Sequence, residues 1–107
     1  MEMIEINIAK EFSDAPGGRS KKGGNFSGEE FREKYLEKYF EDPSDDRTIQ
    51  IILDGAYGYP TSFLEESFGG LARKYGKDRV MKRLVFKSVD EPLLIEEIKL
   101  YISECEK

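Results

Sequence analysis

The middle of the chain, residues 48–66, constrains the fold most, because it combines an apolar strand, a tight turn and the start of a helix. β-Branched residues dominate positions 48–53, and such a near-continuous apolar run is typical of a parallel strand covered on both faces. After the turn, Ser62 is followed three residues later by Glu65, the spacing of a capping box. The pattern therefore predicts a central strand followed by a helix that Thr61 or Ser62 caps.

The flanking segments repeat these signals. Ile4, Ile6 and Ile8 alternate with polar residues, which predicts a first strand at 3–9. Residues 15–28 are rich in glycine, serine and lysine and predict a flexible loop, with a second short strand between its turn signals as one option. One helix is predicted to begin at Ser27, the helix after the central turn to run from about Phe63, and a last helix to open at Asp90-Glu91-Pro92, with a further strand at 83–88.

This order of elements predicts one α/β domain spanning residues 1–107. We expect a mixed, mostly parallel sheet of about four to five strands packed with about three helices, with the first strand able to pair antiparallel in a hairpin. Gly69 and Gly70 lie inside the second predicted helix, where each glycine costs roughly 1 kcal/mol relative to alanine. A close contact with the sheet or with a partner is expected to compensate for that cost.

Composition excludes several classes of function. The chain has 107 residues, of which 22 are acidic and 17 basic, and its net charge of −5 disfavours nucleic acid as the main partner. No apolar run is long enough to cross a bilayer, and the first residues lack a signal-peptide layout, so we expect no membrane association and a cytoplasmic location. With no histidine and one cysteine, Cys105, we expect no metal, no cofactor and no enzyme activity.

The turn before the second helix holds the first group of candidate site residues. Ser62 lies at a positive helix end that suits either an anion or an ordinary cap. Tyr57 and Tyr59 form either an exposed aromatic rim or a packed turn. The paired glutamates of the two helix starts, Glu29-Glu30 and Glu65-Glu66, are interpreted as complements to the helix dipoles.

A second group could hold an anion. Gly18 and Arg19, beside two lysines, concentrate positive charge and let backbone amides approach closely, although a solvated loop is the alternative interpretation. Asp54 closes the central strand, where ligands often bind in open α/β sheets, and could pair with Arg19 or Arg73. A turn-stabilising role is the more common one for an aspartate in this position.

Taken together, four segments resemble the STAS-like domain family, the small α/β relatives of bacterial anti-sigma factor antagonists: Pro16-Gly-Gly-Arg19, Ser27-Gly-Glu-Glu-Phe-Arg32, Leu53-Asp-Gly55 and residues 59–71. The resemblance implies a regulatory role through protein binding, without enzyme activity. It also implies that Ser62, with Thr61 beside it, matches the serine that a histidine-kinase-like ATPase phosphorylates in the antagonists.

Two functional hypotheses follow. The first is a regulatory interaction module whose surface includes Tyr57, Tyr59 and Phe63 and whose partner is a kinase-like ATPase or another regulator. The alternative is a protein that binds a small anionic ligand or nucleotide with the Gly18-Arg19 loop and the Ser62 helix end. Assembly into a homo-oligomer is a third possibility.

Overall fold

The computed structural model describes residues 3–105 and contains a parallel sheet of three strands in the order β1-β2-β3. The strands are β1 (Met3–Asn7), β2 (Thr48–Ile52) and β3 (Leu84–Lys87). In the register, Ile51 of β2 lies between Ile6 of β1 and Phe86 of β3. The sheet is therefore parallel throughout, whereas the sequence predicted a mixed, mostly parallel sheet.

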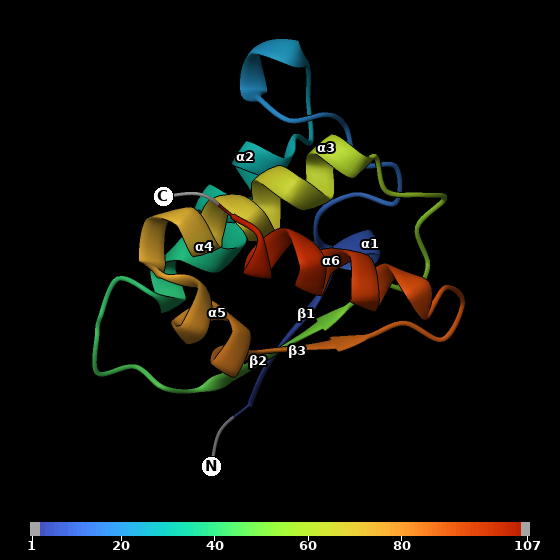
Figure 1. Cartoon of the computed structure of the whole chain (residues 1–107). Helices are drawn as coiled ribbons and strands as arrows, with labels where there is room; N and C mark the ends of the chain where they lie inside the picture. The colour runs from blue at the N-terminus through green and yellow to red at the C-terminus, as the bar shows by residue number, and fades with distance from the viewer. Residues whose placement is uncertain (1–2, 106–107) are drawn as a thin grey trace.

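Helical segments make up most of the remaining chain (Figure 1). The first long helical run comprises α2 (Gly28–Phe31), η2 (Arg32–Leu36) and η3 (Glu37–Tyr39), and the second comprises α3 (Thr61–Leu64), η4 (Glu65–Gly69) and α4 (Gly70–Tyr75). The others are α1 (Ile8–Glu11), η1 (Lys21–Gly23), α5 (Lys77–Arg83) and α6 (Leu93–Ser103). Each of the three predicted helices thus has a counterpart, and α1 and α5 are additional.

Three expectations about the sheet were wrong. Residues 3–105 hold three strands rather than four or five, and β1 pairs parallel with β2 rather than antiparallel in a hairpin. The loop at 15–28 forms the short helix η1 and no strand. The first helical run lies between β1 and β2, which gives the chain the length that a parallel crossover requires.

The prediction that the central strand is covered on both faces was also wrong. The helices α2, α3, α4 and α6 lie on one side of the sheet (Figure 1). Ile49 and Ile51 are fully buried on that side, whereas Val85 on the opposite side is 44% exposed. Successive crossovers of the same hand across strands in chain order place their helices on one face, which leaves the other face open.

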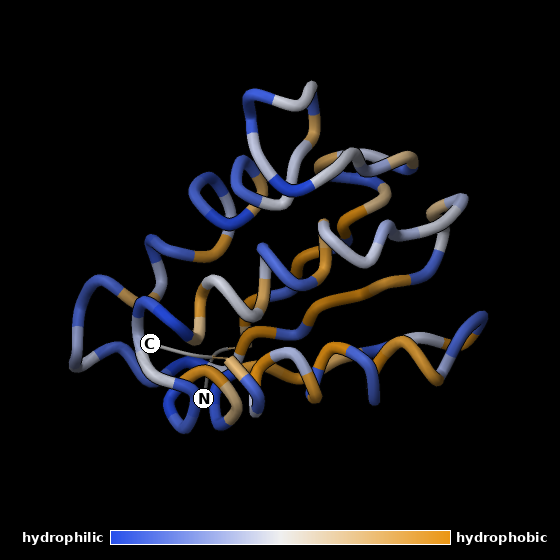
Figure 2. The backbone as a smooth tube through the Cα atoms, turned by 45° about the horizontal axis from the view of Figure 1, so that its top comes forward, coloured by the Kyte–Doolittle hydropathy of each residue, from blue (hydrophilic) through white to orange (hydrophobic). Residues whose placement is uncertain are grey.

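The core lies between this single helical layer and the sheet. Its largest buried side chains are aromatic and aliphatic, and hydrophilic residues are concentrated in the outlying loops (Figure 2). Phe31 of α2 contacts Phe63 of α3 with ring centroids 5.8 Å apart, and Phe68 of η4 contacts Phe86 of β3 at 5.3 Å. These contacts fix the first and second helical runs side by side above the sheet.

The close contact predicted at Gly69 and Gly70 is present, but it joins helical segments. A Cβ atom at Gly70 would lie 2.6 Å from Nη1 of Arg32, and one at Gly69 would lie 3.4 Å from the carbonyl oxygen of Tyr101 in α6. Glycine at these positions therefore allows Arg32 and α6 to approach the second helical run.

The predicted start of the first helical run agrees with the structure. Ser27 is the N-cap of α2, and its side chain accepts a hydrogen bond from the backbone N–H of Glu30 at 3.1 Å. The carboxylate of Glu30 accepts from the N–H of Phe26 at 3.2 Å, one residue before the donor of a standard capping box. Gly76, with φ +98°, ends α4 as expected for a glycine C-cap.

Candidate functional site

The candidate site is the start of α3 together with the loop that covers it. We call residues 15–27 the strap. Backbone hydrogen bonds close the strap: Gly17 donates to the carbonyl of Phe26 at 2.8 Å, and Gly28 donates to that of Gly18 at 2.8 Å. The loop predicted to be flexible is therefore tied down at both ends by backbone pairing.

The strap brings Gly18 against Ser62. A Cβ atom on Gly18 would lie 3.9 Å from the Oγ atom of Ser62, although the two residues are far apart in the chain. The sequence analysis proposed these two residues as parts of one site, and the structure places them side by side.

The prediction that Thr61 or Ser62 caps this helix was wrong. Pro60 occupies the N-cap position of α3, and the cap has no side-chain hydrogen bond. The carbonyl of Pro60 accepts from the N–H groups of Phe63 at 3.0 Å and Leu64 at 3.2 Å, so the backbone closes the first turn by itself. Ser62 is half-buried within that turn and Thr61 is exposed.

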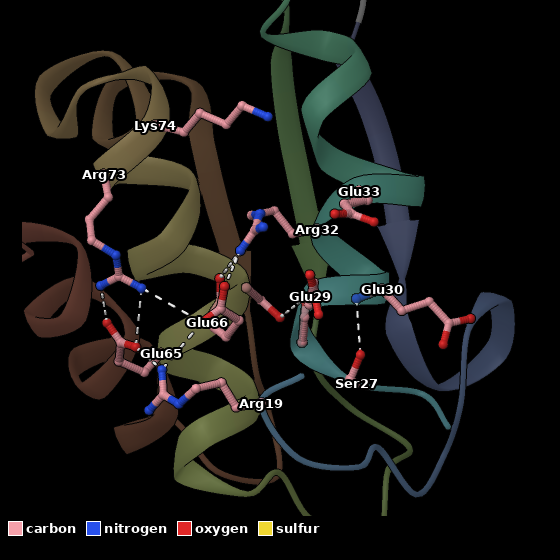
Figure 3. A network of polar contacts seen from close by, with 12 residues as sticks. Arg19, Ser27, Glu29, Glu30, Arg32, Glu33, Glu65, Glu66, Arg73 and Lys74 are labelled. Carbon is pink, nitrogen blue, oxygen red and sulfur yellow. Dashed lines mark hydrogen bonds and ion pairs between the residues drawn. The ribbon is translucent and has the colours of Figure 1, made fainter. Parts of the chain in front are cut away.

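Two glutamates in the turn after Ser62 organise a network of arginines (Figure 3). Glu65 pairs with Arg19 of the strap and with Arg73 of α4. Hydrogen bonds from Arg73 and Arg19 hold the pKa of Glu65 below its usual range, against the opposing effect of burial. Glu66 pairs with Arg32 of the first helical run and lies 3.4 Å from Arg19.

The network continues across the first helical run. Nε of Arg32 donates to Glu37 at 2.7 Å, and Nζ of Lys74 contacts the other oxygen of Glu37 at 2.7 Å. Burial raises the pKa of Glu37, but hydrogen bonds from Lys74 and Arg32 outweigh it and leave the pKa lowered. Alternating positive and negative side chains thus connect the strap with both helical runs.

Most of this network was not predicted from the sequence. Glu65 and Glu66 were interpreted as complements to the helix dipole, and Arg32, Glu37 and Lys74 were not assigned to any site. The spacing of Glu66 and Arg73, seven residues apart, does place both on one helical face and was an available signal. No local spacing could have revealed the pairing of Arg32 with Glu66, because it depends on the packing of two helical runs.

Asp54 lies in another part of the molecule. Its carboxylate accepts hydrogen bonds from the backbone N–H of Asp90 at 2.8 Å and from that of Val89 at 2.8 and 3.0 Å, which lower its pKa. The proposed pairing with Arg19 or Arg73 was therefore wrong, since both arginines are held by Glu65. Asp54 joins the loop after β2 to the loop after β3.

The aromatic residues of the turn divide into exposed and packed members. Tyr57 is 90% exposed, as a contact surface requires. Tyr59 is half-buried, donates its hydroxyl to the carbonyl of Leu53 at 2.8 Å and stacks on Phe63. Phe63 is fully buried, so its predicted place on the partner surface was wrong: the aromatic cluster under the strap encloses it.

The charge balance of the site limits its chemistry. The guanidinium groups of Arg19 and Arg73 already face carboxylates, so a small anion would have to compete with Glu65 and Glu66 for them. Within residues 3–105 no cluster of three or more histidine, cysteine or acidic residues could hold a metal ion. No helix in the same range is long and apolar enough to cross a membrane.

The fold and site define a class of small α/β domain with a parallel sheet, helices on one face and a hydroxyl-bearing turn after the central strand. Residues 27–94, more than half of the chain, match the family described as a STAS-like domain of unknown function (DUF4325). The chain therefore belongs to this STAS-like family, as its sequence motifs suggested. Searches of curated proteins and of solved structures find no match.

The match covers β2, β3 and both long helical runs but begins at the last residue of the strap. The anchor Pro16-Gly-Gly-Arg19, on which the resemblance partly rested, lies outside it. Ser62, Glu65 and Glu66 lie inside the match, whereas Arg19, which pairs with the two glutamates, does not.

Proposed function

We propose that this STAS-like domain is a non-enzymatic regulatory module that binds another protein and is switched by phosphorylation of Ser62. The observation that carries the proposal is the state of the Ser62 side chain. It is partly accessible, lies in the first turn of α3 and is not needed to cap the helix, because Pro60 performs that role through its carbonyl group. A hydroxyl in this position is available for modification without loss of a cap.

The electrostatics of the site also suit a phosphate. A phosphoserine adds about −1.5 to −2 charges at neutral pH, and Glu65 and Glu66 would repel it if they were unpaired. Their carboxylates are instead balanced by Arg19, Arg73 and Arg32. The start of the helical run, with its positive dipole end, adds to the favourable potential.

Phosphorylation would compete with an existing contact. The backbone of Gly18 lies against Ser62, and the next residue, Arg19, pairs with Glu65. A phosphate on Ser62 offers Arg19 a doubly charged acceptor in place of Glu65. The strap would shift toward α3, and the surface that the partner contacts would change.

The partner supplies the chemistry. A kinase-like ATPase, the partner type that the STAS-like resemblance suggests, would transfer the γ-phosphoryl group of ATP to Oγ of Ser62. The Oγ–P bond forms as the bond to the β-phosphate oxygen breaks, ADP leaves, and a base on the kinase takes the hydroxyl proton. This chain contributes the acceptor and no catalytic group.

A pull-down from lysate of the source organism tests the proposal with the intact chain as bait. Wild type, Ser62→Asp and Ser62→Ala are compared, with Ser103→Asp, an exposed serine at the end of α6, as the control for an added charge. We expect a kinase-like ATPase or regulator on the wild-type and Ser103→Asp baits and its loss from Ser62→Asp. Mass spectrometry should find phosphate on Ser62.

If the Ser62→Asp and wild-type baits retained the same proteins, the proposal that Ser62 phosphorylation acts as a switch would be rejected. If no bait retained a specific partner, the interaction-module hypothesis would be rejected. Binding of a small ligand or assembly into a homo-oligomer would then be the remaining candidate functions. A thermal-shift screen of nucleotides and phosphorylated metabolites then decides between those, since a ligand at 100 times its Kd stabilises the protein by about 2.7 kcal/mol.

A further inference from the structure

The carboxyl ends of β2 and β3 lead into two loops, residues 54–60 and 88–92, that project from the same end of the molecule (Figures 1 and 2). Asp54 joins them, because its carboxylate accepts from the backbone N–H groups of Val89 and Asp90 at 2.8 to 3.0 Å. The two loops are therefore held together as one surface.

This surface gathers exposed apolar side chains. Tyr57 is 90% exposed, Leu93 80% and Val89 71%, which makes them the three most exposed large apolar residues in the part of the chain that the structure describes. We call these three residues the apolar rim. Exposed apolar side chains gathered at one place are typical of an interaction site, whereas scattered ones need no explanation.

A shallow depression that could receive a side chain lies beside the apolar rim, and Tyr57 is the member of the rim that lines it. A depression of about 70 Å³ lies between the two loops, lined by Leu53, Tyr59 and Leu94 as well as by Tyr57 and the acidic pair Asp90 and Glu91. A second, more open hollow lies between the same acidic pair and Leu93. The lining of the depression combines apolar side chains with the two carboxylates, so it suits the tip of an aliphatic or aromatic side chain that has a basic neighbour.

The charges around the apolar rim are mostly negative. Asp90 and Glu91 are exposed, and Asp54 is held ionised by its backbone hydrogen bonds, which lower its pKa. Asp14 belongs to the same region, because its carbonyl accepts from the N–H of Tyr57 at 2.8 Å. Lys87, which faces Asp54, is the neighbouring cation.

We propose that the apolar rim docks a segment of another protein that carries an aliphatic or aromatic anchor flanked by lysine or arginine. The inference rests on the proposed function and specifies the chemistry of the partner. Negative charge disfavours a nucleic acid here, and a second copy would bring the same acidic loops together. A patch of this size supports a weak, salt-sensitive contact, which suits a partner that must be released.

The test uses the full chain labelled with ¹⁵N and three synthetic peptides. The first has a leucine and a phenylalanine flanked by lysine and arginine, the second replaces the basic residues by glutamate, and the third replaces the two anchors by serine. We expect the first peptide to shift the amide resonances of residues 57, 88–91 and 93 with a Kd tighter than about 1 mM, and the other two to shift them little. Added salt should weaken the effect.

Leu93→Glu is the decisive variant, and Leu100→Glu is its matched control on the same helix, since Leu100 is 51% exposed and lies outside the apolar rim. Leu93→Glu should weaken peptide binding about tenfold, and Leu100→Glu should leave it unchanged. Equal effects of the two variants, or equal binding of the acidic peptide, would overturn the inference.

The remaining outcomes separate this inference from the proposed function. Shifts centred on residues 18–19 and 62 would overturn the inference that the apolar rim is the docking site. They would support binding at the surface around Ser62. If none of the three peptides caused shifts, the inference that the apolar rim docks a partner segment would be overturned. The pull-down with Ser62 variants would still test the proposed regulatory function. Self-association in light scattering that Leu93→Glu abolishes would make a second copy the occupant and overturn the inference.

Discussion

The guanidinium group of Arg19 pairs with the carboxylate of Glu65, 46 residues further along the chain. This contact ties the strap to the helical run that follows Ser62, and Arg73 shares the same carboxylate. The strap is therefore held by backbone hydrogen bonds at its ends and, over the candidate site, by the ion pairs of Arg19 with Glu65 and Glu66. That arrangement allows the strap to be loosened without unfolding the domain.

We expect Arg19→Gln to loosen the strap with little loss of global stability. The Arg19 side chain is 49% exposed, and an ion pair of this kind contributes about 0 to 1 kcal/mol. Limited proteolysis with trypsin, followed by mass spectrometry, should show faster cleavage after Lys21 and Lys22. Arg79→Gln, which removes a contact with the carbonyl of Asp42, is the control, and equal acceleration by both variants would contradict the prediction.

Gly28→Ala should destabilise the protein. A Cβ atom at Gly28 would lie 2.5 Å from the carbonyl oxygen of Phe63, a backbone atom that cannot move aside easily. Overpacking of this kind typically costs about 1 to 3 kcal/mol, measurable by urea denaturation. Gly23→Ala is the matched control because a Cβ there meets nothing within 4 Å, and a similar loss in both variants would contradict the contact.

Two serines at helix starts should respond differently to alanine. Ser27 caps α2 through a hydrogen bond to the N–H of Glu30, so Ser27→Ala should lower the free energy of unfolding by about 1 kcal/mol. Ser62 does not cap α3, and Ser62→Ala should change stability by less than about 0.5 kcal/mol. Chemical denaturation of both variants checks this, and a loss of stability in Ser62→Ala comparable to that in Ser27→Ala would restore the cap interpretation.

Stability should fall in acid. The pKa values of Glu65 and Glu37 are lower in the folded protein than in the unfolded chain, so folding releases protons. Their contribution is present above the unfolded pKa and is lost as the pH falls through the lower folded pKa, in the range below about pH 4. Urea denaturation at a series of pH values should show this fall, and Glu65→Gln should flatten it.

Glu104→Gln, which changes an exposed carboxylate at the end of α6, is the control for the acid series. If it flattened the pH dependence as much as Glu65→Gln does, the paired state of Glu65 would not be the cause.

Local patterns predicted the elements that depend on neighbouring residues. The start of the first long helix at Ser27 was correct, because a cap acts within a few residues. The spacing of Ser62 and Glu65 did not mark a helix cap, although it is the same as the spacing of Ser27 and Glu30. Pro60 begins the helix earlier and moves Ser62 into the first turn.

The candidate site was predictable in part. The chain pattern placed Ser62, Gly18 and Arg19 together in one hypothesis, and the strap does bring them together. It also placed Asp54 there, but Asp54 turns to the loop after β3, where unpaired backbone N–H groups need an acceptor. The burial of Phe63 was not predictable from its place in the turn, because it depends on the rings of Phe12, just after α1, and Phe31 of α2 that pack around it.

The sequence by itself determined the membership in the STAS-like family, the apolar strands and the long helical runs, because periodicity and capping act over one or two turns of chain. The tertiary structure decided which side of the sheet the helices cover, which carboxylate Arg19 and Arg32 bind, and where the apolar rim lies. These features depend on contacts between segments distant in sequence. Their energies exist only once the helical runs and the sheet have packed.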